Sequence, residues 1–324
     1  MTDVPPHPFR SGDAASYGLT RAGVEQLLRA GVLRRPFRGV LVRADLPDTI
    51  ELRATCAQLV LPPHVVLSDR SAAWLHGIDA YDPAALELVP DLEVVSVDHN
   101  DRTRREGVLG GKRDLRPDEI CEVCGTLTTT ALRTACDLAA QRGRSAALAV
   151  LDAFMRHHRL TREDYRRMLP RFRGRRGVKQ LRELINHASP DAESPGESWT
   201  RMAILDAGIP CPTPNVWVDV AGYGRVRLDL AWAALKIAVE YDGQEFHTSE
   251  RQRQNDETRR TALRRDGWVV IVVTKDDFTG DRLALWLATL REALRDRRPP
   301  ARRRYSRGAW DGPRRRRTAT SRMH

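Results

Sequence analysis

The segment 225–247 restricts the fold most, because it places three carboxylates within two strand-like apolar runs. Apolar residues alternate with other residues in both runs, which is the period of a half-buried strand. If residues 234–235 form a two-residue turn, the runs pair as an antiparallel hairpin with Asp229 opposite Glu240. One face of this hairpin would be apolar, with Leu228, Leu230, Trp232, Ile237, Val239 and Tyr241. The other face would carry Asp229, Glu240 and Asp242.

Like charges directly opposite each other on neighbouring strands destabilise a sheet. At least one of these carboxylates would be driven towards protonation unless a cation lies between them. Oxygen ligands suit a hard cation such as Mg²⁺, which takes one or two carboxylates together with waters and substrate phosphate. An ion held in this way would polarise a phosphodiester and activate water. The simpler interpretation is a solvated strand face, which is the usual position of Asp and Glu.

The net charge of the chain favours a polyanionic partner. Lys and Arg number 54 against 43 Asp and Glu, a formal net charge of +11 over 324 residues. Nucleic acid, DNA in particular, is therefore the first candidate partner. Part of the excess lies in residues 297–324, an Arg-rich segment without periodicity, which predicts a disordered basic tail that could contact phosphates. The alternative is a tail that only improves solubility.

Other features of the composition indicate where the chain works. It contains no apolar run of about 18 residues, so we expect no membrane span. Its first ten residues contain three prolines and no apolar segment, unlike a secretory signal. The five cysteines are an odd number scattered over a long chain, unlike a disulfide framework. These features predict a cytoplasmic protein with no membrane partner.

A helix and a basic hairpin are expected near the N-terminus. Residues 19–30 have helical apolar spacing, with Thr20 as the helix start and Gly31 as its stop. Residues 32–42 then form a short hairpin-like element with three basic side chains, Arg34, Arg35 and Arg38. A helix followed by a basic wing is the outline of a winged helix-turn-helix, in which these arginines would contact DNA. An ordinary α/β subdomain is the alternative.

Residues 189–196, rich in Ser and Pro, are the predicted domain boundary. The pattern after them has the order α-β-β-β-α-β-α, which predicts an α/β domain with a mixed sheet. Its elements are expected at 197–207, 214–220, 225–242, 250–265, 268–274 and 281–296. The predicted parts of the whole chain are a flexible leader (1–15), a winged-helix-like domain (16–80), an α/β to helical middle region (81–190), the C-terminal domain (191–296) and the basic tail (297–324).

Several single features have both a structural and a functional interpretation. Glu197 lies at a helix start with capping-box spacing from Ser194, or it supplies a further metal ligand. His247 is a loop histidine, or a general acid or base. Arg259 lies on a charged helix that is either solvated or in contact with phosphates. The lone Cys121-x-x-Cys124 motif lacks the second pair of ligands that a structural zinc ion needs.

Several motifs occur in order between residues 190 and 290. They are E-S-W-T-R, A-G-I-P-C-P, R-L-D-L-A-W, A-V-E-Y-D-G-x-x-x-H, D-E-T-R-R-x-x-L-R-R-D-G-W-x-V and V-T-x-D-D. Together they resemble the family of endonuclease-like proteins related to the very-short-patch mismatch repair nuclease, within the PD-(D/E)XK superfamily. Residues 17–190 resemble an N-terminal region of the abortive-infection antitoxin type, on the motifs L-T-R-A-G-V-E-Q-L-L-R-A-G-V-L-R-R, S-D-R-S-A-A-W-L-H-G-I and T-T-T-A-L-R-T-A-C-D-L-A.

The first resemblance implies a restriction-endonuclease-like domain and roles for five residues. Asp229 would be the central ligand of Mg²⁺ or Mn²⁺, Glu240 the second acidic ligand, and Glu197 an acidic residue contributed by the first helix. Asp242 and His247 match the family's E-x-D-G-x-x-x-H pattern. The wider superfamily has lysine at the position of Asp242, where it orients water or stabilises the transition state. The resemblance implies that His247 takes over this share of the chemistry.

Two hypotheses about function follow. The first is a Mg²⁺-dependent endonuclease that hydrolyses DNA, with a winged helix that binds DNA or a partner protein. The second is a non-catalytic DNA-binding regulator or antitoxin-like protein, which keeps the nuclease fold as a scaffold. The missing lysine and the antitoxin-like first half motivate the second hypothesis. An RNA-directed enzyme is compatible with the charge, although the chain shows no aromatic RNA-binding signature.

Overall fold

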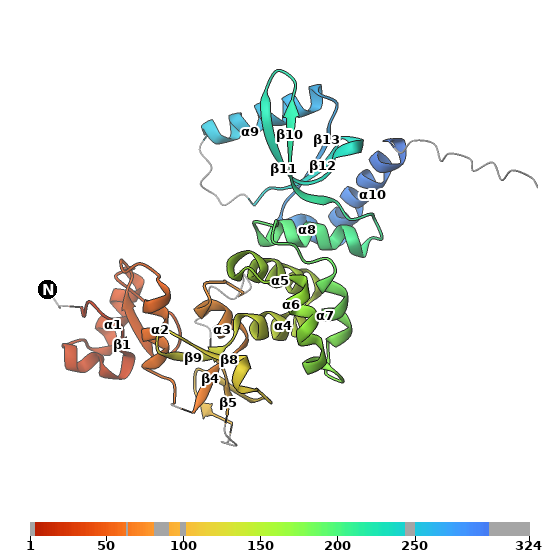
Figure 1. Ribbon diagram of the computed structural model, residues 1–324. Coiled ribbons are helices and arrows are strands. Elements are labelled where there is room, and N and C mark those ends of the chain that lie inside the picture. Colours follow the sequence, from red (N-terminus) through yellow and green to blue (C-terminus); the bar gives the residue numbers. More distant parts are fainter. Residues whose placement is uncertain (1–3, 63, 81–90, 98–101, 244–249, 298–324) are drawn as a thin grey trace, which may run out of the picture.

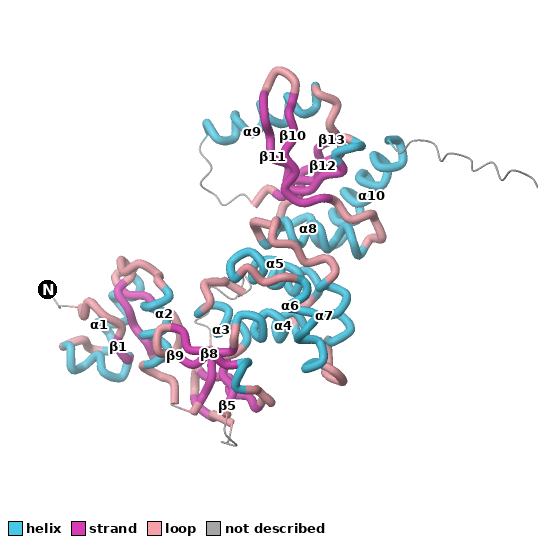
Figure 2. The backbone as a smooth tube through the Cα atoms, viewed as in Figure 1, coloured by secondary structure: helices cyan, strands magenta, loops and turns pink. Residues whose placement is uncertain are grey.

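The computed structural model describes residues 4–62, 64–80, 91–97, 102–243 and 250–297. Strands gather at two ends of the molecule, and a layer of helices lies between them (Figure 2). The N-terminal strands and a six-stranded sheet lie at one end, and a four-stranded sheet lies at the other (Figure 1). In the described part of the chain, no helix is both long and apolar enough to cross a membrane.

Short elements form the N-terminal part. They are β1 (Phe9–Arg10), the 3-10 helix η1 (Ser11–Tyr17), α1 (Arg21–Arg29), β2 (Leu33–Arg34) and β3 (Val40–Arg43). Helix α1 begins at Thr20 as predicted, because the Thr20 hydroxyl accepts a hydrogen bond from the Gly23 N–H at 3.1 Å. The predicted hairpin is present as β2 and β3, and β1 adds a third strand in the order β1-β3-β2.

The end of the predicted flexible leader (1–15) forms secondary structure together with residues 16–17. Residues 9–17 form β1 and η1, and Phe9 is buried in a small core with Leu19 and Val24. A two-residue strand and a 3-10 helix are too short to leave a periodic signal in the sequence. The predicted winged-helix-like domain (16–80) contains α1, the hairpin of β2 and β3, and two later helices at 50–58 and 69–75, an arrangement that does not by itself identify a winged helix-turn-helix.

A six-stranded mixed sheet, in the order β6-β7-β5-β4-β9-β8, forms the first half of the middle region. Its strands are β4 (Val65–Leu67), β5 (Leu92–Ser96), β6 (Arg104–Arg105), β7 (Val108–Lys112), β8 (Ile120–Val123) and β9 (Thr126–Thr129), with the 3-10 helix η3 (Pro117–Glu119) before β8. Helices α2 (Ile50–Gln58) and α3 (Asp69–Leu75) share a core with this sheet and with Phe37 of the N-terminal part. Residues on both sides of the predicted boundary at residue 80 therefore belong to one core.

The Cys121-x-x-Cys124 motif lies in the hairpin of β8 and β9. Cys124 and Gly125 form its two-residue turn, with φ angles of 47° and 75°. Positive φ at both positions is the conformation of a type I′ hairpin turn. All five cysteines of the chain are free.

The helical layer follows the sheet. It consists of α4 (Ala131–Gln141), α5 (Arg144–His158), α6 (Arg162–Met168), the 3-10 helix η4 (Leu169–Phe172) and α7 (Val178–Ile185). Arg133 of α4 is fully buried and pairs with Glu119 of η3, next to the sheet, at 2.9 Å, and with Asp137 of α4 itself at 2.7 Å. A buried charge is stable only when it is paired, so the Arg133–Glu119 pair attaches α4 to the segment that precedes β8.

The C-terminal part has the predicted order of elements, α-β-β-β-α-β-α. These are α8 (Pro195–Asp206), β10 (Thr213–Val220), β11 (Gly224–Trp232), β12 (Ile237–Tyr241), α9 (Glu250–Arg265), β13 (Val269–Val273) and α10 (Gly280–Arg297), with the 3-10 helices η5 (Ala233–Leu235) and η6 (Lys275–Phe278). The sheet order is β10-β11-β12-β13, with β12 and β13 parallel and the other pairs antiparallel. The prediction of a mixed sheet in an α/β domain is therefore confirmed.

The predicted register of the central hairpin is also confirmed where β11 and β12 pair. Leu230 lies opposite Val239, and Trp232 lies opposite Ile237. The turn differs from the prediction, because a 3-10 turn at 233–235 is followed by Lys236 in the left-handed conformation, with φ of 49°. A loop of four residues closes the same register as the predicted loop of two.

The prediction of one apolar face and one acidic face is wrong. Leu228 packs with Ala238 and Leu263 on the side of α9, whereas Leu230 packs with Val239 and Trp286 on the side of α10. Helices cover both faces of the sheet, so both faces carry apolar side chains.

Helix α8 joins the helical layer to the C-terminal sheet (Figure 1). Met202 packs into the core of the helical layer, and Ile204 packs into the core of the C-terminal part. Arg201 forms a buried ion pair with Asp152 of α5, with side-chain exposures of 1% and 2%. The predicted boundary at 189–196 therefore precedes a helix that is built into both neighbouring cores.

Candidate functional site

Asp229 lies between Leu228 and Leu230, whose side chains pack on opposite faces of the C-terminal sheet. Val216 pairs with Leu228 and Pro214 with Leu230, but Asn215 and Asp229 between them do not pair. Asn215 has a φ of 49°, which interrupts the alternation of side chains along β10. The carboxylate of Asp229 instead accepts a hydrogen bond from the Tyr241 N–H of β12 at 2.9 Å. Asp229 is thereby held against the strand that carries Glu240.

The environment of these carboxylates favours the protonated form. Burial raises the pKa of Asp229 to about 6, and the negative charges of Glu197 and Glu240 add to this effect. The hydrogen bond from Tyr241 and the charge of Arg259 act in the opposite direction. Burial also raises the pKa of Glu240, against the effect of Arg259. Burial is therefore the main cause of both raised pKa values, and the charge of Glu240 is a smaller contribution to that of Asp229.

Two arginines of α9 neutralise the acids of β12. Arg259 donates a hydrogen bond to Glu240 Oε2 at 2.7 Å, and Arg260 donates one to Asp242 Oδ2 at 2.9 Å. Glu240 is 3% exposed, and its second oxygen, Oε1, is buried with no hydrogen-bond partner among the described residues. The α9 side of the site is therefore closed by guanidinium groups, and one carboxylate oxygen stays unused.

Glu197 is occupied at the start of α8. Its carboxylate accepts hydrogen bonds from the Ser194 hydroxyl at 2.9 Å and from the Glu193 N–H at 3.0 Å. The Asn215 side-chain amide donates a further bond to it at 3.2 Å. The Glu197 N–H in turn donates to Ser194 Oγ, so Ser194 caps the helix and Glu197 binds the Ser194 hydroxyl and the preceding backbone N–H. The structural interpretation of Glu197 accounts for both of its oxygens.

The donor set supplies at most two carboxylates for a metal ion. Among the described residues, no three His, Cys, Asp or Glu side chains lie together as a metal centre would require. Asp229 and Glu240 are the pair that fits, since Mg²⁺ commonly takes one or two carboxylates and no described residue donates a hydrogen bond to the buried Glu240 Oε1. Glu197 does not fit in this conformation, because the helix start engages it. His247 lies outside the described residues.

The arginines predicted to contact nucleic acid divide into two places. Three of them, Arg34, Arg35 and Arg38, lie on β2 and the loop that follows it. The fourth, Arg259, lies on α9 in the C-terminal part and forms an ion pair with Glu240. Each of the three faces an acid: Arg34 is 3.9 Å from Asp48, Arg35 is 2.9 Å from Glu25, and Arg38 contacts Glu106. Of these three side chains, Arg38 is the most exposed, at 55%.

Sequence reasoning missed Arg260 and Asn215. Arg260 neutralises Asp242. The side-chain amide of Asn215 donates a hydrogen bond to Glu197, and Asn215 lies at the interruption of side-chain alternation in β10. The charged pattern at 250–265 indicated a helix rich in arginine, but it did not indicate which acidic side chains these arginines would pair with. Asn tolerates positive φ better than most residues, and this is a weak signal for its position.

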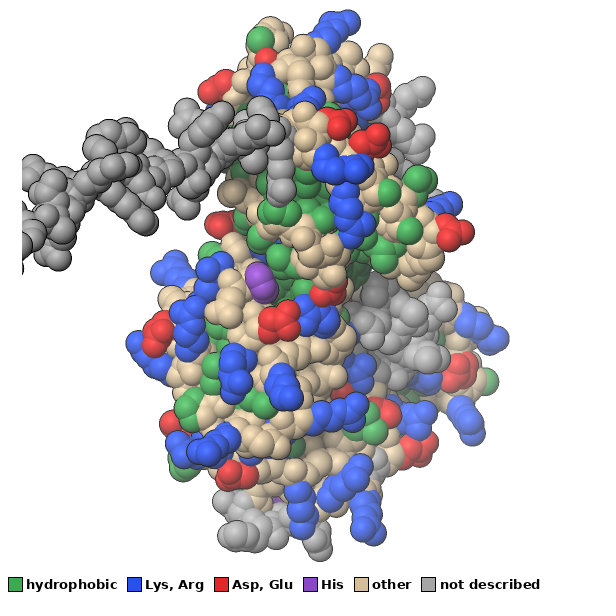
Figure 3. All heavy atoms as spheres, turned by 90° about the vertical axis from the view of Figure 1, so that its right-hand side faces the viewer, with side chains coloured by type: hydrophobic (Ala, Val, Ile, Leu, Met, Phe, Trp, Pro, Cys, Tyr) green, Lys and Arg blue, Asp and Glu red, His purple; other side chains and the backbone are tan. Residues whose placement is uncertain are grey.

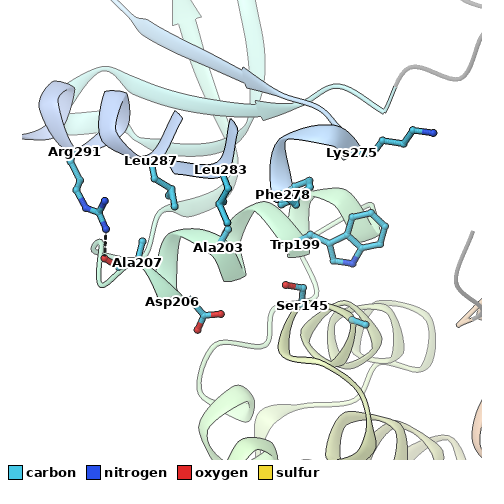
Figure 4. A pocket seen from close by; sticks show the side chains of 11 residues that line it. Ser145, Trp199, Ala203, Asp206, Ala207, Lys275, Phe278, Leu283, Leu287 and Arg291 are labelled. Carbon is cyan, nitrogen blue, oxygen red and sulfur yellow. Dashed lines mark hydrogen bonds between the residues drawn. The ribbon is translucent and has the colours of Figure 1, made fainter. Parts of the chain in front are cut away.

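A mostly apolar cavity of about 620 Å³ lies between the helical layer and the C-terminal part (Figure 4). Trp199 and Phe278 line it from α8 and η6, and Arg291 of α10 donates a hydrogen bond to the Ala207 carbonyl at 2.9 Å. Asp229 and Glu240 do not line it. Figure 3 shows apolar side chains gathered in the hollow between the C-terminal part and the rest, with Lys and Arg spread over the surface below.

Comparison with known proteins identifies the middle region and a set of relatives. Residues 64–187, from β4 to the end of α7, match the AbiEi antitoxin C-terminal domain. Two proteins of Mycobacterium tuberculosis, the uncharacterized proteins MT2308 (strain CDC 1551 / Oshkosh) and Rv2248 (strain ATCC 25618 / H37Rv), are similar over most of their length. Each is 30% identical over 260 residues, which cover 80% of this chain and 92% of the relative. The chain belongs to their family.

The family match confirms the antitoxin-like resemblance for residues 64–187. The endonuclease-like part, residues 190–290, rests on its sequence motifs. Both curated relatives are uncharacterized by name, so they assign no activity to the family.

Proposed function

We propose that this protein is a DNA-binding regulator of the antitoxin type, whose C-terminal nuclease-like domain does not cut. The observation that carries the proposal is the match of residues 64–187 to the AbiEi antitoxin C-terminal domain. The C-terminal acids support it, because Arg259 forms an ion pair with Glu240 and Arg260 forms one with Asp242. Asp242 also stands where the nuclease superfamily has lysine.

DNA would be held through its phosphates, in keeping with the net charge of +11. Arg34, Arg35 and Arg38 of the N-terminal hairpin are the candidate contacts, and Arg38 is the most accessible of them. Its partner Glu106 is 83% exposed, so the pair contributes little to stability and Arg38 can exchange Glu106 for phosphate.

Arg38→Gln should weaken duplex binding across sequences and flatten its salt dependence. Loss of one phosphate contact lowers the magnitude of the slope of log K against log salt by about 0.9. Fluorescence anisotropy with a labelled duplex in EDTA measures both quantities. The wild type should bind without divalent ions, and Asp229→Asn should bind equally well.

The matched control is Arg167→Gln on α6, where the side chain is 71% exposed and lies far along the chain from the hairpin. Equal losses in both variants would point to diffuse attraction and remove the role of Arg38. Wild-type protein that binds no duplex in EDTA would contradict the regulator function. Full-length chains are needed, because a chain that ended at residue 190 would leave Asp152 buried without Arg201.

A protein partner belongs to the same proposal. An antitoxin-type regulator would bind a toxin, with the N-terminal region as the candidate contact. Co-expression with a candidate toxin and size-exclusion chromatography test this, and two separate peaks would refute it. A cytoplasmic location is part of the proposal, in keeping with five free cysteines.

A Mg²⁺-dependent endonuclease is the second candidate function. The observation that favours it is the pair of half-buried Asp229 and buried Glu240, with a raised pKa at both residues and a Glu240 Oε1 that has no hydrogen-bond partner in the described part of the chain. Asp229 and Glu240 would hold Mg²⁺ or Mn²⁺, and Glu197 would join them only after leaving the helix start. The ion would supply the activation of water and of the phosphodiester. His247 would move a proton to or from the reacting oxygen.

A supercoiled-plasmid assay separates the two candidates. The regulator proposal predicts no nicking above background with Mg²⁺ or Mn²⁺. Nicking by the wild type that disappears in Asp229→Asn and persists in Asp219→Asn would establish the nuclease. Asp219 is the matched control, because it is exposed on the same β10–β11 hairpin. Equal nicking by all three proteins would indicate a contaminating nuclease and leave the regulator proposal in place.

A further inference from the structure

The β10–β11 hairpin exposes aromatic and basic side chains together. Trp217 is 54% exposed, and Tyr223 near the turn is 43% exposed. Trp217 lies directly opposite Arg227, and the guanidinium carbons of Arg225 and Arg227 lie 5.0 Å and 5.9 Å from the centre of its ring. Figure 1 shows this hairpin projecting away from the helical layer.

Packing within the hairpin does not account for the exposure of Trp217. The alternating residues Val216 and Val218 turn towards the core beneath α9, which places Trp217 on the opposite, solvent-exposed face. The cross-strand contacts of Trp217 with Arg225 and Arg227 contribute to hairpin stability, yet Trp217 stays 54% exposed. An indole with more than half of its surface in water is accessible for stacking with a base.

The two arginines have different roles on this face. Glu193 holds Arg227 through two hydrogen bonds, at 2.5 Å and 2.6 Å, and so fixes its guanidinium beside the ring. Arg225 is exposed and has no ion pair among the described residues. This face therefore combines an aromatic ring in a fixed position with Arg225, an exposed cation that can bind a phosphate.

We infer that Trp217, Arg225 and Arg227 form a stacking platform for an unpaired nucleotide of single-stranded nucleic acid. Aromatic rings stack on any base because every base has a π-face, and flanking arginine adds cation–π attraction and a phosphate contact. Bases inside a duplex already stack on one another, so an intact duplex offers this hairpin its backbone but not its base faces. The inference extends the proposed DNA-binding function to a second nucleic-acid surface, distant in sequence from Arg38.

The test uses full-length protein in EDTA with a fluorescein-labelled oligothymidylate of about 15 nucleotides and a duplex of equal length. Trp217→Leu should weaken single-strand binding about five- to 100-fold and leave duplex binding within about twofold. Trp217→Phe keeps a ring and should retain most of the affinity. Arg225→Gln should lower the magnitude of the salt slope for the single strand by about 0.7, whereas Trp217→Leu should not change it.

The control is Leu285→Ala, which removes an exposed apolar side chain (70% exposed) from α10 and should leave binding unchanged. Wild-type single-strand affinity in Trp217→Leu, or an equal loss for single strand and duplex, overturns the platform. If the wild type binds duplex but not the single strand, the platform fails and the regulator function stands. If it binds neither, the proposed function fails as well. A Trp217→Leu defect confined to binding of a purified protein partner would make this face a protein interface.

Discussion

Arg201→Leu should lower the free energy of unfolding by about 3–5 kcal/mol, because it leaves the carboxylate of Asp152 buried without its partner charge. Asp152 also accepts hydrogen bonds from the Ser189 N–H at 2.7 Å and the Ser198 hydroxyl at 2.6 Å. Burial already raises the pKa of Asp152 to about 6 against the effect of Arg201. Loss of Arg201 would raise this pKa further and weaken the attachment of α8 to α5.

The matched control is Arg144→Leu, which removes a second ionic contact between α5 and α8. Arg144 is 33% exposed and contacts Glu183 at 2.6 Å and Asp206 at 2.8 Å. Water screens this site, so the loss should stay below about 1 kcal/mol. Urea unfolding at neutral pH, followed by circular dichroism, measures both variants. An equal decrease in the free energy of unfolding in both variants would show that the buried pair contributes no more to stability than the exposed one.

A double variant separates charge from packing at the Asp152 site. Asp152→Asn combined with Arg201→Leu removes both charges and keeps an acceptor for the Ser189 N–H. It should recover part of the loss caused by Arg201→Leu alone, because no unpaired charge remains. A double variant that is less stable than Arg201→Leu would place the effect in packing of the Arg201 stem.

Asp229→Asn should stabilise the protein at pH 8 by about 2–3 kcal/mol and have little effect near pH 4. The folded-state pKa of Asp229 is about 6, against an ordinary value of 3.8. The folded protein therefore binds this proton more tightly than the unfolded chain does. The resulting stability is full below pH 3.8 and is lost as the pH rises through about 6. Asparagine stays neutral and still accepts the Tyr241 N–H bond.

Urea unfolding from pH 4 to pH 8 checks this prediction. The difference between wild type and Asp229→Asn should grow between pH 4 and pH 6 and then level off. Asp219→Asn, on the exposed face of the same hairpin, should change stability by less than about 0.5 kcal/mol at every pH. A constant difference between Asp229→Asn and wild type at all pH values would mean that the carboxylate is not strained by burial. Destabilisation at pH 8 would mean that the Asp229 charge has a partner.

Much of the local structure could be predicted because its causes lie close together in the chain. Hydroxyl side chains at Thr20, Thr130, Thr161 and Ser194 accept bonds from the first turns of α1, α4, α6 and α8. The hairpin register of β11 and β12 followed from apolar alternation alone, although the turn residues gave no favoured type. The order of elements in the C-terminal part followed from the same periods.

The candidate site was predicted less completely. The sequence placed Asp229 beside Glu240, and the structure holds Asp229 against β12 through the Tyr241 N–H. The sequence did not show that Arg259 and Arg260 would close the site. The sequence also predicted a single apolar face for this hairpin. An alternating pattern does not show that helices will cover both faces of a sheet.

The sequence by itself determined the order of elements in the C-terminal part, the register of β11 and β12, and the basic character of the chain. These depend on capping, periodicity and composition, which act over a few residues or sum over all of them. Only the tertiary structure decided which charges meet: Arg201 with Asp152, Arg259 with Glu240, and Arg225 beside Trp217. Burial and pairing set the energy of a charge, and both arise only when elements distant in the chain pack together.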